Sequence, residues 1–383
     1  MKIMYLLFSF TIGGAERLVT NICNELVKNH EIHLYIVNEL YSPELINCLD
    51  KRIRVKFAHR EGHGHRLKSI FDVTRYICDN QIEVVHCNSL NSPDLLVLKS
   101  LFFKDVRVVQ TVHNMHYFQN MPLWRLKIRN TVCQQYIAIS DSVKADVIGV
   151  GIEATKVTTI YNAINLDEFI SVRDRKGKNI CKNICKTEKT EATNFEKYKL
   201  VPVRIGVLAR IDLAQKGQDL LLYALDMLNV QCPIECYIGG EADSNHKKDW
   251  DELIEIADKL QSENSNIKIF FLGKIIDVPK FLNSLDIFVM PSRFEGFGIS
   301  LIEAMAMGIP CIACNIDGPA EILGNNQRGL TFETGNVQDL AAKITQMMRG
   351  DYIKYIDNDQ YLYDNYSMTE MCKKLLEVYQ HVE

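Results

Sequence analysis

The amino-acid sequence predicts an α/β protein built from two doubly wound, Rossmann-like domains. Its 383 residues exceed the size at which a single hydrophobic core stops growing, and 47% of them are hydrophobic, which is enough for two cores. Short apolar, β-rich segments alternate with helical patterns from the start of the chain, and the alternation restarts at Val203 after a polar, charge-dense stretch. Strands that alternate with helices imply right-handed crossovers and a parallel sheet in each domain.

The first domain is predicted over residues 1–165. In its first helix, Leu18, Ile22 and Leu26 recur at helical spacing behind a short apolar strand. Strands are expected at 3–9, 31–37, 52–58, 83–88, 106–113 and 135–140. Helices are expected at 15–29, 67–79, 93–102 and 122–135, followed by a short helix that Ser140 or Asp141 opens.

A linker or surface excursion is predicted over 166–200, and the second domain over 201–365. Its strands are expected at 203–209, 233–241, 267–273, 287–292 and 310–315, and its helices at 217–229, 247–262, 278–284, 299–307 and 337–348. The C-terminal stretch 366–383 reads as an amphipathic helix that packs back on the first domain. Two open sheets joined by one linker should face each other across a cleft at the carboxyl ends of their strands, where ligands of this architecture usually bind.

Composition and charge argue against several classes of protein. A formal net charge of -4 disfavours a nucleic-acid binder, which normally carries a basic excess. Several of the twelve cysteines, Cys23 and Cys311 among them, lie in apolar runs where a thiol behaves as a small hydrophobe, so we expect reduced thiols in the cytoplasm. No stretch reaches the roughly 18 uninterrupted apolar residues of a membrane span, so any membrane contact should be peripheral, at the inner face.

A glycine loop follows the first predicted strand. Gly13 and Gly14 open the next helix, so backbone N–H groups and the helix N-terminus suit an anion or a closely approaching sugar. A simple tight turn is the alternative. The loop is not a dinucleotide fingerprint, because no third glycine follows at the required spacing and no acidic residue ends the second strand.

A second loop carries two cations. Arg210 ends the strand at 203–209, and Lys216 stands just before a helix. An arginine fork and a lysine point charge that converge from one loop suit a diphosphate. Ordinary surface charges on a solvated loop are the alternative.

The stretch SRFEGFGISLIEAMAMGIP (292–310) places two glutamates eight positions apart. The chain turns on Gly296 and Gly298, after which Ile299, Ser300 and Leu301 should present unpaired N–H groups to an anion. Glu295 precedes the turn and can reach a group attached to that anion. Glu303 lies on the helix and can accept hydrogen bonds from the vicinal hydroxyls of a ribose.

In this order the motifs resemble the family 4 retaining glycosyltransferases, whose fold is the two-domain GT-B arrangement. They cover nearly the whole chain: the GGAER loop, ISDSV, YNAIN, the R-x5-K loop from Arg210 to Lys216, GGE at 239–241, LGKIIDV, the E-x7-E stretch and DGPAEIL. Two positions depart from the family pattern. Ala209 stands where glycine is usual, and Asn114 stands where aspartate is common.

The resemblance implies a nucleotide-sugar donor held mainly by the second domain. Its diphosphate would lie on Arg210 and Lys216, its ribose on Glu303 and its sugar near Glu295. His113, at the end of a first-domain strand, would touch the donor sugar near the reaction centre. The remaining donor-binding candidates, with the base near 273–278, are Gly13, Gly14, Gly240, Gly273, Lys274, Val278, Gly296, Phe297, Gly298, Ile299, Ser300 and Leu301.

We therefore expect a metal-independent, retaining transferase that moves a sugar from a nucleotide-sugar donor, for which we favour a UDP-sugar. The expected acceptor is a glycan or a lipid-linked molecule in cell-surface polysaccharide or glycoconjugate synthesis. Arg210, Lys216 and the helix N-terminus would stabilise the charge of the departing diphosphate, so neither a metal nor another cofactor is required. Two alternatives stay open: a non-catalytic GT-B partner subunit, and a sugar-nucleotide epimerase. A nicotinamide dehydrogenase is disfavoured by the missing fingerprint.

Other features favour ordinary structural roles. Cys311 and Cys314 spell C-x-x-C but lie in a predicted buried strand, and Cys181 with Cys185 lacks further ligands for a metal. The histidine-rich stretch 59–68 is interpreted as a solvated loop rather than as a zinc site. Trp124 lies in a stretch, 120–130, that mixes apolar and basic residues, which suits the outer face of a core helix better than a peripheral membrane contact.

Overall fold

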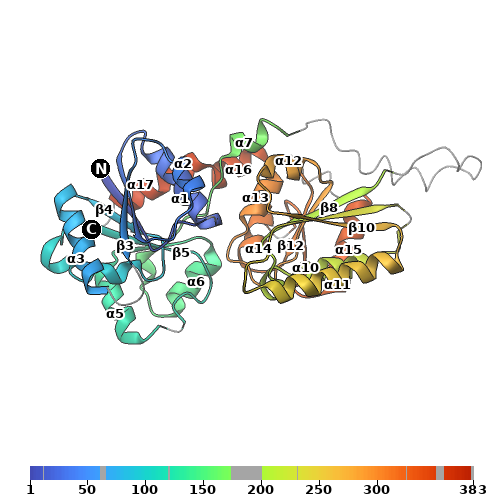
Figure 1. The fold of residues 1–383 in the computed structure, drawn as a ribbon, viewed down its shortest axis with the longest axis horizontal. Coiled ribbons are helices and arrows are strands. Elements are labelled where there is room, and N and C mark those ends of the chain that lie inside the picture. Colours follow the sequence, from blue (N-terminus) through green and yellow to red (C-terminus); the bar gives the residue numbers. More distant parts are fainter. Residues whose placement is uncertain are drawn as a thin grey trace, which may run out of the picture. The chain divides into compact units, whose positions relative to one another are not determined.

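The structure is a computed structural model that describes residues 1–11, 13–60, 66–119, 121–173, 201–230, 232–324, 326–350 and 358–380. The chain divides into two compact units (Figure 1). Unit 1 comprises Met1–Asn165 and Tyr363–Glu383, and unit 2 comprises Leu166–Leu362. Each unit holds one parallel sheet with its own buried core.

The sheet of unit 1 has the strand order β3-β2-β1-β4-β5-β6-β7, and every neighbouring pair is parallel. Its strands are β1 (Lys2–Leu7), β2 (Glu31–Asn38), β3 (Arg54–Arg60), β4 (Val84–Cys87), β5 (Arg107–Val112), β6 (Gln135–Ala138) and β7 (Val157–Thr159). Their buried, apolar runs are those of a sheet covered on both faces. The predicted doubly wound sheet is confirmed, although the short strand β7 carried too few residues to be recognised from its pattern.

The helices of unit 1 follow the predicted order, with two short elements that were not predicted, Pro43–Asn47 and Ala154–Lys156, and one helix that takes another form. They are α1 (Gly14–Leu26), α2 (Pro43–Asn47), α3 (Arg66–Asn80), η1 (Ser92–Leu96), α4 (Lys99–Phe102), α5 (Leu123–Val132), α6 (Asp141–Gly149), η2 (Ala154–Lys156) and α17 (Met368–Gln380). The helix expected at 93–102 is instead a 3-10 turn followed by a short α-helix, two forms that apolar spacing does not distinguish. Ser140 caps α6 by accepting from the Val143 N–H.

Unit 2 repeats the topology. Its sheet has the order β10-β9-β8-β11-β12-β13, again with parallel neighbours. The strands are β8 (Val203–Leu208), β9 (Ile234–Gly239), β10 (Ile267–Gly273), β11 (Ile287–Met290), β12 (Cys311–Cys314) and β13 (Leu330–Phe332). The helices are α7 (Leu166–Ile170), α9 (Leu213–Lys216), α10 (Gln218–Asp226), α11 (Lys247–Glu263), α12 (Val278–Asn283), α13 (Ile299–Ala306), α14 (Asp317–Leu323) and α15 (Val337–Met348). A further helix, α16 (Asp359–Tyr366), includes the boundary between Leu362 and Tyr363.

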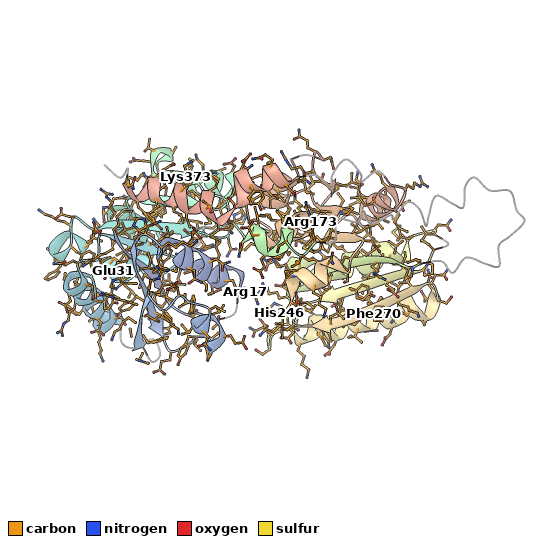
Figure 2. The ribbon with its side chains drawn as sticks, turned by 90° about the horizontal axis from the view of Figure 1, so that it is seen from above. Arg17, Glu31, Arg173, His246, Phe270 and Lys373 are labelled. Carbon is orange, nitrogen blue, oxygen red and sulfur yellow. The ribbon has the colours of Figure 1, made fainter. Side chains whose placement is uncertain are left out.

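Part of the predicted linker is ordered secondary structure. Residues 166–170 form α7, which packs against α13 inside unit 2. Just beyond it, Arg173 (Figure 2) makes a bidentate ion pair with Asp359 at 2.7 and 2.6 Å and also donates to the Ala306 carbonyl. The rest of the predicted linker, 174–200, lies outside the described residues. The linker therefore begins later than the polar composition suggested, because Leu166 and Phe169 are buried.

The C-terminal helix α17 packs against α1 in unit 1. Its buried residues Met371, Leu375 and Tyr379 belong to the same core as Leu18 and Ile22 of α1. A buried hydrogen-bond network extends from this contact into the sheet: the Tyr379 hydroxyl lies 2.8 Å from that of Tyr5 and 2.5 Å from His86 Nδ1, and His86 Nε2 lies 2.6 Å from Thr111 Oγ1.

In both sheets the order in which the strands are added reverses at one point, although all strands stay parallel. In unit 2 the first strand, β8, has β9 on one side and β11 on the other, so the chain winds outward both ways from the β8–β11 pair. Loops that leave the carboxyl ends of two such strands diverge to opposite faces and leave a crevice that suits a ligand. Arg210 and Lys216 follow β8, and Glu295 follows β11. The topology thus brings together the two loops that the sequence singled out.

Candidate functional site

The loop after β8 and the loop after β11 are joined by backbone contacts. The Gln215 carbonyl accepts from the N–H groups of Arg293 and Phe294 at 2.8 and 3.2 Å. The Arg293 guanidinium donates to the Leu213 carbonyl and makes a bidentate ion pair with Asp219 at 2.7 Å in both arms. These bonds join the two loops, whose residues lie about 80 positions apart in the sequence.

Arg210 leaves β8 with its guanidinium held at one edge. Its Nη2 donates to Asp212 Oδ2 at 2.7 Å and to Gln215 Oε1 at 2.5 Å, while half of the side chain stays exposed. The Gln218 side chain donates to the Arg210 carbonyl at 2.7 Å. The fork is therefore anchored on one side and available to a ligand on the other.

Lys216 ends α9, one position before Gly217. Its Nζ lies 2.7 Å from Glu295 Oε2, and each of the two side chains is only 16% exposed. The two residues are 79 positions apart in the sequence and meet because the loops are joined. The lysine that was expected to bind a phosphate is thus ion-paired with a carboxylate of the protein itself.

The helix α13 begins at the glycine turn, as predicted. Gly298 is its N-cap at φ 109°, a conformation that favours glycine, and no side chain caps the helix. The Ile299 and Ser300 N–H groups have no protein acceptor among the described residues. The expectation for Leu301 was wrong, because its N–H donates to the Gly298 carbonyl at 3.1 Å in a tight first turn.

Four further residues lie in or beside this turn. Phe297 is buried, and Gly296 leads into it. A Cβ on Gly318 of α14 would lie 2.4 Å from the Phe297 Cα, so glycine at 318 allows α14 to approach the turn. Glu303 is half-buried on α13, and its side chain was predicted to meet a ribose.

The carboxyl ends of β9 and β10 form the neighbouring edge. Gly240 adopts φ 140°, its N–H donates to the Gly273 carbonyl at 2.8 Å, and a Cβ there would lie 1.8 Å from the Ala209 carbonyl oxygen. The backbone after β8 can therefore approach β9 closely even though Ala209 is not glycine. Lys274 follows this contact, and Val278 begins α12.

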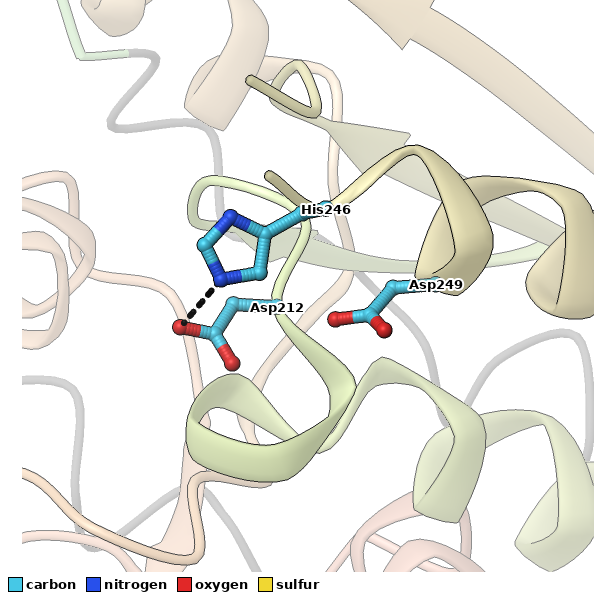
Figure 3. Close-up of side chains that lie close together, drawn as sticks. All are labelled: Asp212, His246 and Asp249. Carbon is cyan, nitrogen blue, oxygen red and sulfur yellow. Dashed lines mark ion pairs between the residues drawn. The ribbon is translucent and has the colours of Figure 1, made fainter. Parts of the chain in front are cut away.

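Asp212, His246 and Asp249 form the one cluster among the described residues with the make-up of a metal site (Figure 3). His246 Nε2 lies 3.4 Å from Asp212 Oδ2, which also accepts from Arg210. Asp212 Oδ1 accepts from the Gln215 N–H, and Asp249 Oδ2 accepts from the Leu213 N–H. These carboxylate oxygens already accept hydrogen bonds from backbone N–H groups of the loop, and the positively charged Arg210 guanidinium lies beside them. The cluster is therefore better suited to stabilise the loop than to bind a cation.

The unit 1 candidates lie at the carboxyl ends of β1 and β5. Gly13 is the N-cap of α1 and Gly14 its first residue, and a Cβ on Gly13 would meet the Glu16 carboxylate at 2.5 Å. His113 directly follows β5, and its Nε2 lies 3.2 Å from Asn88 Oδ1. Burial lowers the pKa of His113 to about 4, so the ring is neutral at neutral pH.

The cysteine pair of β12 is structural, as expected from its apolar run. Cys311 and Cys314 are both buried within that strand. Burial, with a further contribution from Glu295, raises the pKa of the Cys314 thiol to about 12. The Cys181 and Cys185 pair and residues 61–65 of the histidine-rich stretch lie outside the described residues.

Sequence patterns did not identify the residues that hold the site together. Asp212, Gln215, Arg293 and Asp219 each make the contacts given above, yet each reads as an ordinary polar residue in the sequence. Asp212 alone carries a local signal, because it caps α9 by accepting from the Gln215 N–H. The partners across the two loops are too distant in the chain for any spacing rule to relate them.

Known proteins resemble the chain along its whole length. The model of Glycosyltransferase Family 4 matches residues 12–168, and that of Glycosyl transferases group 1 matches residues 191–365. The O-antigen biosynthesis glycosyltransferase WclY of Escherichia coli is 22% identical over 100% of this chain and 99% of the relative. An uncharacterized 41.2 kDa protein in the cps region of Klebsiella pneumoniae is 24% identical over 88% and 87% of the two chains. The crystal structure of Anabaena HepE in complex with UDP superimposes with a TM-score of 0.79 at 19% identity, covering 99% of this chain and 100% of that chain.

Proposed function

Because the chain belongs to the family 4 glycosyltransferases, we propose that it transfers a sugar from a UDP-sugar, with retention of the anomeric configuration, to a glycan or lipid-linked acceptor. The observation that supports the donor proposal is the joined pair of loops in unit 2, in which the loop of Arg210 and Lys216 is bonded to the loop that leads into α13. The UDP bound to the structurally similar HepE supports uracil as the base of the donor nucleotide. The O-antigen role of WclY supports a cell-surface glycan as the acceptor.

Charge development explains what these groups would do. Breaking the anomeric C–O bond leaves a nucleoside diphosphate with additional negative charge. The Arg210 fork, the Lys216 ammonium and the Ile299 and Ser300 N–H groups would donate to this charge and stabilise it. Glu295 would then face the sugar, Glu303 the ribose, and His113, as a neutral ring, the sugar near the reaction centre.

Nucleotide binding tests the donor proposal directly. We expect UDP to raise the melting temperature of the full chain more than GDP or ADP does, and Arg210→Ala to abolish that shift. No stabilisation by any of the three nucleotides would overturn the proposal. UDP-sugars with matched acceptors then identify the sugar and the linkage.

Two further measurements address the mechanism and the alternatives. Retention predicts that NMR of the first product shows the anomeric configuration of the donor, and metal independence predicts an unchanged rate in excess EDTA. A sugar-nucleotide epimerase would convert the UDP-sugar without an acceptor. A non-catalytic partner subunit would bind UDP and transfer nothing.

A peripheral membrane contact through α5 belongs to the same proposal. In this helix Leu126, Arg129 and Val132 are buried, whereas Leu123 and Trp124 are 73% and 65% exposed. Arg125 and Arg129 are both paired with Asp94, so Lys127 is the basic side chain of this helix that is exposed beside the apolar residues, which suits an anionic bilayer surface. No described helix combines the length and the apolar character needed to cross a bilayer.

Vesicle co-sedimentation tests this contact. Binding to phosphatidylglycerol vesicles should exceed binding to phosphatidylcholine vesicles and fall in Trp124→Ser. Met227→Ser, which alters an exposed apolar residue of α10 in unit 2, serves as the control. Equal binding of Trp124→Ser and the unaltered chain would refute the α5 contact.

A further inference from the structure

Each cationic side chain of the proposed diphosphate site is ion-paired with a carboxylate in the structure. Arg210 pairs with Asp212 at 2.7 Å, and Lys216 pairs with Glu295 at the same distance. A carboxylate beside a cation can have two opposite roles. It can hold the cation in the geometry that a ligand needs, or it can occupy the place that the ligand takes.

Asp212 is fixed by several bonds besides its ion pair. Its Oδ1 accepts from the Gln215 N–H at 2.9 Å, which caps α9, and its backbone carbonyl accepts from the Lys216 N–H at 2.6 Å. His246 approaches the same carboxylate at 3.4 Å from the loop before α11. The side chain is only 8% exposed, so it cannot leave Arg210 without uncapping the helix.

Glu295 has no comparable support. Lys216 is its one hydrogen-bonding partner in the part of the chain that the structure describes. It stands in an irregular loop between the exposed Phe294 and Gly296, and a glutamate side chain there can turn about three bonds. Lys216, in contrast, is positioned by α9 and by the backbone bond to Asp212. The pair can therefore open by movement of the carboxylate alone.

We propose that Glu295 is a placeholder: in the donor-free protein it occupies the position on Lys216 that a diphosphate oxygen takes on binding, whereas Asp212 keeps its pair with Arg210 throughout. This inference rests on the proposed function and concerns the order of events in the same site. An incoming diphosphate exchanges one anion for another on Lys216, so the half-buried ammonium is never left unpaired. The displaced carboxylate becomes available to the sugar. After transfer, its return to Lys216 favours release of the nucleotide.

The two carboxylates should respond in opposite directions to neutralisation. Glu295→Gln removes a competitor for Lys216, so UDP should bind about five-fold more tightly, as for the loss of a partly buried ion pair. Asp212→Asn keeps an oxygen that can cap α9 but removes the charge that holds the Arg210 fork, so UDP should bind about ten-fold more weakly or worse. Calorimetric titration of the full-length variants with UDP measures both changes, and melting temperatures without ligand show that both variants are folded.

A general electrostatic effect gives a different result. If lost negative charge alone strengthened UDP binding, both variants would bind UDP more tightly, and the proposal would be overturned. Glu255→Gln, on the exposed face of α11, makes the same charge change away from the site and should leave UDP affinity unaltered. Should Glu295→Gln bind UDP no better than the unaltered protein, Glu295 is not a placeholder. An unaltered protein that binds no UDP contradicts the proposed function itself, which is a distinguishable outcome.

Discussion

Gly217 lies directly against the carbonyl oxygen of Pro291, so close that a Cβ at position 217 would stand 2.2 Å from that oxygen. Gly217 adopts φ 64° and joins α9 to α10 just after Lys216, while Pro291 directly follows β11 and begins the loop that carries Glu295. The missing side chain lets the two loops of the site touch. A glycine that a sequence shows only as a helix boundary therefore sets the position of Lys216 relative to Glu295.

Gly217→Ala should destabilise the protein and weaken UDP binding together. The substitution adds backbone strain at positive φ and a clash with backbone that cannot move aside, for which we expect a loss of about 2–4 kcal/mol in the free energy of unfolding. Gly335→Ala is the matched control, because Gly335 has φ 79° but open space around its Cα. Urea unfolding of both variants would contradict the packing argument if their losses were equal.

Arg293→Ala should also separate the two loops. It removes the bidentate pair with Asp219 and the bond to the Leu213 carbonyl, and it leaves a largely buried carboxylate without its partner. We expect a loss of about 1–3 kcal/mol in the free energy of unfolding and weaker UDP binding. Arg75→Ala breaks an exposed helix pair with Asp79 and should cost less than about 0.5 kcal/mol. Equal losses in the two variants would argue against a role for Arg293 in joining the loops.

Glu303→Ala tests the ribose assignment. Loss of two hydrogen bonds to a carboxylate should weaken UDP binding about ten-fold or more. Inorganic pyrophosphate has no ribose, so its affinity should be the same for the variant and the unaltered protein. Competition titrations with both ligands separate the two cases. A parallel loss of pyrophosphate affinity would place Glu303 at the phosphates or show that α13 has shifted.

Stability should fall with pH through the histidine range. Burial, with a smaller contribution from His113, lowers the pKa of His86 to about 3, against about 6.5 in an unfolded chain. Between these values only the unfolded state binds the proton, so the free energy of unfolding decreases as the pH falls from about 6.5, by up to about 1.4 kcal/mol per pH unit for this residue. His86→Gln should be less stable at pH 7 but lose that part of the slope. Urea unfolding from pH 7 to pH 5 compares the two slopes, and identical slopes would refute the assignment.

Hydrophobic periodicity was sufficient for the two parallel sheets and most of their helices. Each of these elements buries a regular stripe of residues, such as Leu18, Ile22 and Leu26 of α1, and such a stripe is visible in a single chain. The three-residue strands β7 and β13 are too short to show a period. The helix expected at 217–229 begins at Gln218 and follows a separate turn, α9, because Gly217 breaks the helical path.

Arg210, Lys216 and Glu295 could be singled out as candidates because charged residues at the ends of strands are visible in the sequence. Their pairing could not, since the contact of Lys216 with Glu295 depends on β8 and β11 lying side by side and on the approach of Gly217 to Pro291. The charges and turns within one loop come from residues that are neighbours in the sequence, so they can be predicted from the sequence. Asp212 lies two positions from Arg210, whereas Glu295 and Lys216 are 79 positions apart. The pairing of Lys216 with Glu295 therefore depends on contacts that only the folded chain makes.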